Sequence, residues 1–164
     1  MAKPIELKLK EGDIAPDFTT TSHDRRIVSL SSFRGKNVIL YFYPKDSTSG
    51  CTKEACAFRD NHAEFKKRGA AILGVSTDST KSHATFVEKY KLPFPLLVDE
   101  DKRIVNAYGV YGPKTFMGFN CGTGTRRITF LIGPDGTIKK IWPKVKPAKH
   151  AREILAALGN GEAV

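Results

Sequence analysis

The chain has 164 residues, 40% of them hydrophobic and 27% charged, which excludes a wholly disordered protein and suits one domain that buries about 70% of its unfolded surface. No apolar run approaches the ~20 residues that cross a bilayer, and the N-terminus lacks a secretory signal's apolar segment, so we expect a cytoplasmic protein with no membrane partner. The net charge of +10 comes from basic residues spread along the chain without a nucleic-acid-binding motif. That spread favours a solvated surface over nucleic-acid binding, with acidic partners or anion steering as the alternative.

The opening of the chain is predicted to be extended. Residues 1–17 form a lead-in, of which residues 1–10 are an N-terminal arm or edge strand. A strand at residues 27–30 leads into a single helical turn ended by Gly35. The continuous apolar run at residues 38–43 is typical of a strand buried on both faces, so we expect it at the centre of a sheet.

Helices and strands then alternate. From residue 52 to residue 67, apolar side chains recur at spacings of three and four, which predicts one helix ended by Gly69. The other elements predicted for this stretch are strands at residues 70–76 and 96–98 and helices at residues 81–90 and 103–108. Helices between buried strands imply parallel crossover connections.

The last third of the chain begins with a stretch that has no periodicity. Residues 109–125 are rich in glycine and aromatic residues, so we predict a long surface loop. A β-hairpin at residues 128–142 and a helix at residues 149–158 follow. Together these elements predict an α/β protein: one thioredoxin-like domain over residues 1–164, with a mixed central β-sheet flanked by helices on both faces.

Cys51 stands where the central strand gives way to the next helix. The apolar run breaks at Pro44, passes through small polar residues and reaches Cys51 at the helix start. Open α/β sheets place their sites beyond the carboxyl ends of their strands. A thiol reacts as its thiolate, and the free N–H groups and dipole of a helix N-terminus favour negative charge. We therefore predict a reactive sulfur here.

The three cysteines are too few and too odd in number for a disulfide-stapled secreted scaffold. Cys51 and Cys56 form C-x4-C, which is neither a C-x2-C dithiol nor a zinc motif, so no metal site is expected. Taken alone, Cys56 can also be read as a small buried hydrophobe. Cys121 lies in the predicted loop, where a role in intermolecular or alternative pairing stays open. His62 is expected in the core or at its boundary, and the other three histidines, in polar contexts, need no special role.

The stretch around Cys51 resembles a known family. Pro44, Thr48 and Cys51 spell P-x3-T-x2-C, and with its flanking residues and the segments from Gly12 to the C-terminal helix the chain resembles the bacterioferritin-comigratory (PrxQ-type) peroxiredoxins. The resemblance implies a thioredoxin-dependent, atypical 2-Cys peroxidase of antioxidant defence that reduces hydrogen peroxide and organic hydroperoxides. It implies no prosthetic cofactor, a thioredoxin or glutaredoxin-like reductant, and a monomer or weak dimer.

The resemblance also assigns roles to side chains. The Cys51 thiolate attacks a peroxide oxygen and becomes a sulfenic acid. The Thr48 hydroxyl, the Cys51 backbone N–H and an arginine hold the peroxide. Pro44 shields the sulfur from water, and Glu54 orients the arginine.

Two adjacent arginines compete for that last position. Strand alternation points Arg126 and Arg127 to opposite faces. The family pattern R-x-[ST]-F-[LI]-I selects Arg127, and Arg126 is the alternative.

Cys56 is the candidate resolving cysteine. At ~1.5 Å rise and ~100° per residue, cysteines five apart on one helix have Cα atoms about 8.6 Å apart. A disulfide tolerates at most ~7 Å. A bond between Cys51 and Cys56 would therefore require the first helical turns to unwind.

Two departures from the family pattern affect the site. Ser49 stands where the family usually carries proline, which predicts a looser loop, and residues 112–125 are longer than usual. A second functional hypothesis keeps the fold and makes the protein a redox-switched binding module or chaperone, its charge recruiting acidic partners.

Overall fold

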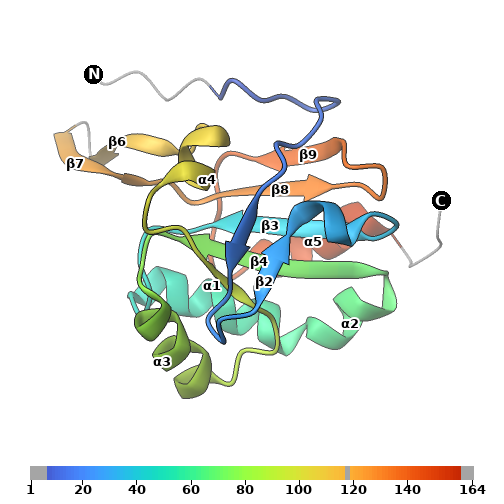
Figure 1. Cartoon of the computed structure of the whole chain (residues 1–164), viewed down its shortest axis with the longest axis horizontal. Helices are drawn as coiled ribbons and strands as arrows, with labels where there is room; N and C mark the ends of the chain where they lie inside the picture. The colour runs from blue at the N-terminus through green and yellow to red at the C-terminus, as the bar shows by residue number, and fades with distance from the viewer. Residues whose placement is uncertain (1–6, 117–118, 160–164) are drawn as a thin grey trace.

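The computed structural model describes residues 7–116 and 119–159, and of residues 114–116 and 119–121 it describes only the backbone. At its centre lies a five-stranded sheet in the order β5-β4-β3-β8-β9 (Figure 1). Its strands are β3 (Asn37–Phe42), β4 (Ala70–Ser76), β5 (Leu96–Val98), β8 (Ile128–Ile132) and β9 (Ile138–Trp142). β3, β4 and β5 run parallel, whereas β8 and β9 run antiparallel to their neighbours. The predicted mixed sheet is therefore confirmed.

β3 separates the two hydrophobic cores of the protein. Alternate side chains of a strand point to opposite faces of its sheet. Ile39 and Tyr41 pack into one core cluster, and Leu40 and Phe42 into the other. Because both faces are covered, the strand reads as a continuous apolar run rather than an alternating one.

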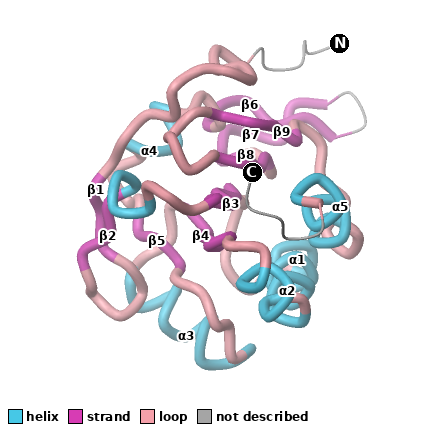
Figure 2. Tube along the Cα trace, turned by 90° about the vertical axis from the view of Figure 1, so that its right-hand side faces the viewer, coloured by secondary structure: helices cyan, strands magenta, loops and turns pink. Residues whose placement is uncertain are grey.

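Helices lie on both faces of the sheet, as predicted (Figure 2). One face carries α1 (Ser49–Asp60), α2 (His62–Lys67), α3 (Thr80–Tyr90) and α5 (His150–Leu158). The other carries η1 (Leu30–Phe33), α4 (Arg103–Ala107) and a small hairpin of β1 (Thr19–Thr21) and β2 (Ile27–Ser29). Within the described ranges, no helix is both long and apolar enough for a membrane span.

The helix predicted over residues 52–67 is two helices. α1 already begins at Ser49, and the chain breaks at Asn61 before α2 resumes. Asn61 leaves helical geometry (φ −106°, ψ 9°), and its side-chain Nδ2 donates to the carbonyl oxygen of Ala57 at 2.8 Å, beside its own backbone N–H at 3.2 Å. Phe58 and Phe65 are nevertheless both fully buried. The shared apolar face explains why the sequence pattern reads as one helix.

The surface loop predicted for residues 109–125 is wrong. β6 (Tyr111–Phe116) and β7 (Phe119–Thr125) form an antiparallel hairpin whose register shifts between Pro113 and Thr115. This hairpin is a separate two-stranded sheet, so its strands lack the pattern of a strand buried in the main sheet. The predicted redox role of Cys121 concerns a side chain outside the described part of the structure.

The N-terminal lead-in contributes one bridge to the fold. Ile14 pairs with Thr137 as an isolated antiparallel bridge. Of the predicted arm or edge strand, residues 7–10 form no strand, and residues 1–6 lie outside the described residues.

Candidate active site

The turn between β3 and α1 presents Cys51. Thr48 precedes α1 as its N-cap, with an extended backbone (φ −76°, ψ 155°). Its carbonyl oxygen accepts the Thr52 N–H at 2.8 Å. Cys51 is the third residue of the helix and lies past the carboxyl end of β3, as the sequence predicted. The first three backbone N–H groups of a helix lack partners within it, and in the described structure Thr48 makes no side-chain capping bond to them.

A guanidinium lies directly against the sulfur. Arg127 Nη2 donates to Cys51 Sγ at 3.3 Å, and Nη1 donates to Glu54 Oε1 at 2.8 Å. The register of the sheet explains the approach, because Ile128 pairs with Phe42 and Arg127 directly precedes that pair. Cys51 is only 1% exposed, and Glu54 is fully buried.

The neighbouring Arg126 points elsewhere. Its Nη2 donates to the carbonyl oxygen of Pro113 at 2.7 Å, at the start of the β6–β7 hairpin. Of the two arginines left open by the sequence, the structure brings Arg127 to Cys51.

Burial of Glu54 changes its protonation. Desolvation raises the pKa of Glu54 to about 7, although Arg127 opposes the shift through charge and hydrogen bonding. Glu54 Oε2 has no hydrogen-bond partner among the described residues. The carboxylate that fixes Arg127 therefore titrates near neutral pH.

Thr48 and Pro44 line the outer part of the turn. Thr48 is exposed, and its Oγ1 donates to the carbonyl oxygen of Lys45 at 2.9 Å. A hydroxyl has one hydrogen, so Thr48 presents its lone pairs to a ligand while this bond lasts. Pro44 is half-buried.

The sequence profile of the AhpC/TSA family matches residues 12–141. A putative peroxiredoxin Bcp of Coxiella burnetii is 45% identical over 93% of this chain and 100% of its own, and the peroxiredoxin Bcp of Escherichia coli K12 is 45% identical over 90% and 94%. A solved structure of Xanthomonas campestris bacterioferritin comigratory protein, described with alkyl peroxide reduction activity, superposes with a TM-score of 0.82, 39% identity and coverage of 93% and 97%.

The chain belongs to the AhpC/TSA family. Its relatives are peroxiredoxins of the Bcp/PrxQ group, so it is a peroxidase of the oxidoreductase class. The thioredoxin-like fold predicted from the sequence is confirmed by these structural neighbours.

Cys56 lies on the same helix as the peroxiredoxin's first cysteine. Cys51 and Cys56 are both free thiols, and Cys56 is half-buried. α1 runs unbroken across both positions, so helical geometry keeps their Cα atoms about 8.6 Å apart. That separation exceeds what a disulfide spans.

Gly50 allows the arginine to approach, a contribution that the sequence analysis missed. A Cβ at this position would lie 3.0 Å from Arg127 Nη2 and 3.7 Å from Pro147 Cγ. A glycine directly before a cysteine in the first turn of a helix, where Gly is a poor helix former, is the signal that could have identified it.

Two histidines predicted to need no special role are fully buried, His83 and His150. His150 Nε2 lies 2.7 Å from Thr129 Oγ1. Burial, and next Arg127, lower the pKa of His150 to about 4, so this ring is neutral at pH 7. His62, expected at the core or its boundary, is half-buried.

His83 belongs to a group of side chains of the kinds that bind metals. Among the described residues, atoms of Asp46, Asp78 and His83 lie within 4.8 Å of one another. Each carboxylate already accepts hydrogen bonds from the protein, and both ring nitrogens of His83 face oxygen atoms. Hydrogen bonds thus account for the group without a cation.

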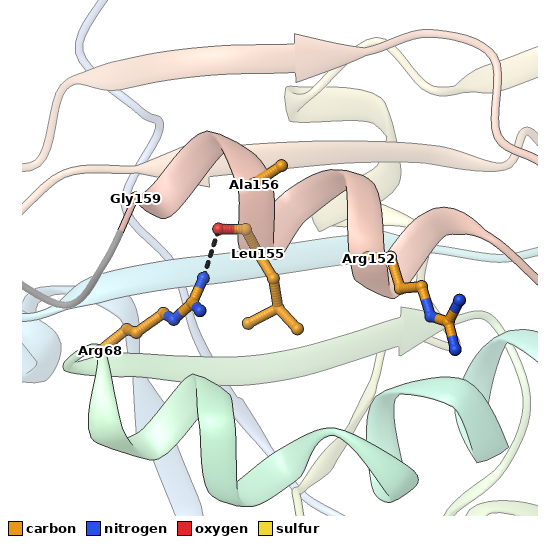
Figure 3. A pocket seen from close by; sticks show the side chains of 5 residues that line it. All are labelled: Arg68, Arg152, Leu155, Ala156 and Gly159. Carbon is orange, nitrogen blue, oxygen red and sulfur yellow. Dashed lines mark hydrogen bonds between the residues drawn. The ribbon is translucent and has the colours of Figure 1, made fainter.

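A separate pocket involves α5 and the end of α2 (Figure 3). Its volume is about 290 Å³, and two arginines, Arg68 and Arg152, line it. Arg68 Nη1 donates to the carbonyl oxygen of Leu155 at 2.6 Å, and Nη2 lies 3.8 Å from Glu64 Oε2. One of the two guanidinium groups that line the pocket is thus already engaged within the protein.

Proposed function

We propose that this peroxiredoxin reduces hydrogen peroxide and organic hydroperoxides with Cys51 as the attacking sulfur. The observation that carries the proposal is the contact between Arg127 and Cys51, with the guanidinium fixed from behind by the buried Glu54. A peroxide bound at this sulfur would meet a donor already in position.

The first step makes and breaks one bond each. The thiolate attacks one oxygen of the peroxide, the O–O bond breaks, and the departing oxygen takes up a proton to leave as water or an alcohol. Cys51 is oxidised to a sulfenic acid. Negative charge spreads over sulfur and both oxygens in the transition state, so fixed donors stabilise it more than the ground state. Arg127 and the Cys51 backbone N–H are those donors.

The turn residues complete the peroxide site. The Thr48 hydroxyl, donating to Lys45, would accept a hydrogen bond from the O–H of a hydroperoxide rather than donate one to it. This refines the role first assigned from the resemblance. Pro44 has no N–H to hold water, so it shields the sulfur from solvent.

The second step resolves the sulfenic acid. The Cys56 sulfur attacks the Cys51 sulfur, an S–S bond forms, the S–O bond breaks and water leaves. α1 must unwind locally to permit this. A dithiol such as thioredoxin, or a glutaredoxin-like protein, then reduces the disulfide by exchange, so the electrons come from an external thiol and no prosthetic cofactor is required.

The test follows peroxide consumption in the presence of thioredoxin, thioredoxin reductase and NADPH. Turnover should be lost in Cys51→Ser and kept in Cys121→Ser. Full turnover in Cys51→Ser would refute the proposal. Stoichiometric oxidation without turnover with any dithiol would favour a redox switch instead.

The resolving residue needs a second experiment. One equivalent of peroxide is added to the reduced protein, and the products are mapped by mass spectrometry. We expect a Cys51–Cys56 disulfide that persists in Cys121→Ser. In Cys56→Ser we expect a sulfenic acid at Cys51, trapped by dimedone.

A further inference from the structure

Asp46 ties the turn that leads to Cys51 to the rest of the protein. Its backbone N–H donates to Asp78 Oδ2 at 2.8 Å, and Tyr43 donates its hydroxyl to Asp46 Oδ1 at 2.6 Å. Ser82 donates to the other carboxylate oxygen, Oδ2, at 2.8 Å. Asp46 is 6% exposed, although it lies in a turn whose next residues are exposed. Main chain and side chain are therefore both anchored at this one position.

The fourth group on Asp46 is the ring of His83. His83 Nδ1 lies 2.7 Å from Asp46 Oδ2, and His83 Nε2 lies 2.9 Å from the carbonyl oxygen of Leu97. A carbonyl oxygen only accepts hydrogen bonds, so Nε2 carries a hydrogen. Nδ1 faces the carboxylate oxygen that also accepts from Ser82. The ring therefore joins Asp46 on one side to the carbonyl oxygen of Leu97 on the other.

The position of Asp46 in the sequence connects this contact to the site. Asp46 lies two residues before Thr48 and five before Cys51. The residue between Asp46 and Thr48, Ser47, has a left-handed backbone (φ 61°), which a residue other than glycine keeps when its surroundings hold it. His83 in α3, which also contacts Leu97 in β5, thus acts on the turn through the Asp46 side chain.

We propose that His83 is a positioning residue for the peroxide site, acting through Asp46 on the turn that carries Thr48. The inference rests on the proposed function, because it concerns how Thr48 and Cys51 are placed for peroxide. His83 does not touch the reacting atoms. It holds the Asp46 carboxylate, and the carboxylate holds the turn.

Two substitutions at His83 separate this role from plain structural support. In His83→Asn the amide nitrogen falls near the place of Nδ1, so the donor to Asp46 remains and the donor to Leu97 is lost. In His83→Gln the amide nitrogen falls near the place of Nε2, so the donor to Leu97 remains and the donor to Asp46 is lost. Both leave one buried acceptor without its partner, so both should lower the melting temperature.

The rate constant for Cys51 oxidation by hydrogen peroxide should distinguish the two variants. We expect about 10- to 100-fold loss in His83→Gln, the scale for misplacement of a site by about 1 Å, and a rate within about threefold of wild type in His83→Asn. Val105→Ala is the matched control, because Val105 is fully buried in the other core. It should lower the melting temperature and keep the rate.

The state of the ring is measured separately in the wild-type protein. Nitrogen-15 NMR of the reduced protein should show a ring proton hydrogen-bonded between His83 Nδ1 and Asp46, whereas its absence would overturn the proposal even if a variant failed to fold. Equal rates in the two His83 variants would also overturn it. Failure of the proposed function looks different, since Cys51→Ser would then keep its turnover.

Discussion

Two buried carboxyl groups, Asp46 and Glu54, lie on either side of Cys51 in the sequence, and they differ in how many of their hydrogen bonds are made. Asp46 receives hydrogen bonds from Tyr43 and Ser82 as well as from His83. Glu54 receives Arg127 on one oxygen, and its other oxygen has no partner among the described residues. A saturated carboxylate keeps its charge and fixes a chain segment, whereas an unsaturated one can take up a proton. The contact between Asp46 and His83 therefore suits an anchor of the turn. The pair of Glu54 and Arg127 suits an adjustable support of the guanidinium.

Arg127→Lys should have the largest effect on the oxidation rate, because it changes the pair of Glu54 and Arg127 directly. Lysine keeps the charge but lacks the planar fork that reaches Glu54 and Cys51 together. We expect the rate of Cys51 oxidation to fall by about 100- to 1,000-fold, the scale for loss of one oriented donor to a transition state. Stopped-flow kinetics with hydrogen peroxide would measure it. Arg126→Lys is the matched control, and an equal loss there would contradict the assignment.

Glu54→Gln should reveal the contribution of the Glu54 proton to stability, because glutamine cannot titrate. The pKa of Glu54 is raised from 4.5 to about 7 in the folded protein, so between these pH values the folded state binds more protons than the unfolded state. Stability should therefore fall as pH rises through this window, by up to about 3 kcal/mol at about 1.4 kcal/mol per pH unit.

The measurement is urea unfolding of wild type and Glu54→Gln from pH 4.5 to pH 7.5. The variant should lack this part of the wild-type slope. We also expect the wild-type oxidation rate to rise near pH 7, as Glu54 loses its proton and pairs with Arg127, and Glu54→Gln to lack this rise. Parallel stability curves for the two proteins would show that the carboxyl group titrates elsewhere.

Gly50→Ala tests the space that Arg127 needs beside α1. Alanine favours a helix by about 1 kcal/mol over glycine, yet its Cβ would meet Arg127 Nη2 at 3.0 Å. We expect the melting temperature to hold or rise while the oxidation rate falls about five- to tenfold, on the scale of a small misplacement. A rate equal to wild type would mean that Arg127 moves aside without losing Cys51.

Ser79→Ala tests the start of α3, the helix that carries Ser82 and His83, and should have the smallest effect on the oxidation rate. Ser79 caps α3 by accepting the Ser82 N–H at 3.1 Å, and Ser82 in turn donates to Asp46. Loss of such a cap costs about 1 kcal/mol. Chemical denaturation should show this loss with less than a threefold change in rate. A larger rate effect would mean that the anchor depends on the exact start of α3.

The proposed reactive centre can be predicted from the sequence because its signals are local. β3 and β4 are continuous apolar runs, and Cys51 follows a break at Pro44. The pattern of the strand that follows predicts Arg127. These features depend on neighbours within a few residues, so they can be recognised without knowing the fold.

The misses depend on contacts between distant segments. Asp46 and His83 are 37 residues apart, and Gly50 matters only because Arg127 arrives from another strand. The sequence does not predict the β6–β7 hairpin, because two strands outside the main sheet need not alternate between apolar and polar residues. A polar residue in a turn reads as solvated until its partner is known.

The break at Asn61 has a consequence for the catalytic cycle. Helix formation is cooperative, so a disturbance in one turn spreads along a continuous helix. Since α1 stops at Asp60 and α2 begins afresh at His62, melting that starts at the turn before Cys51 can end at this discontinuity. Phe65, packed in the core from α2, would keep its place while the two sulfurs approach. If Cys51 and Cys56 form the proposed disulfide, this interruption would limit the segment that refolds after each turnover to α1.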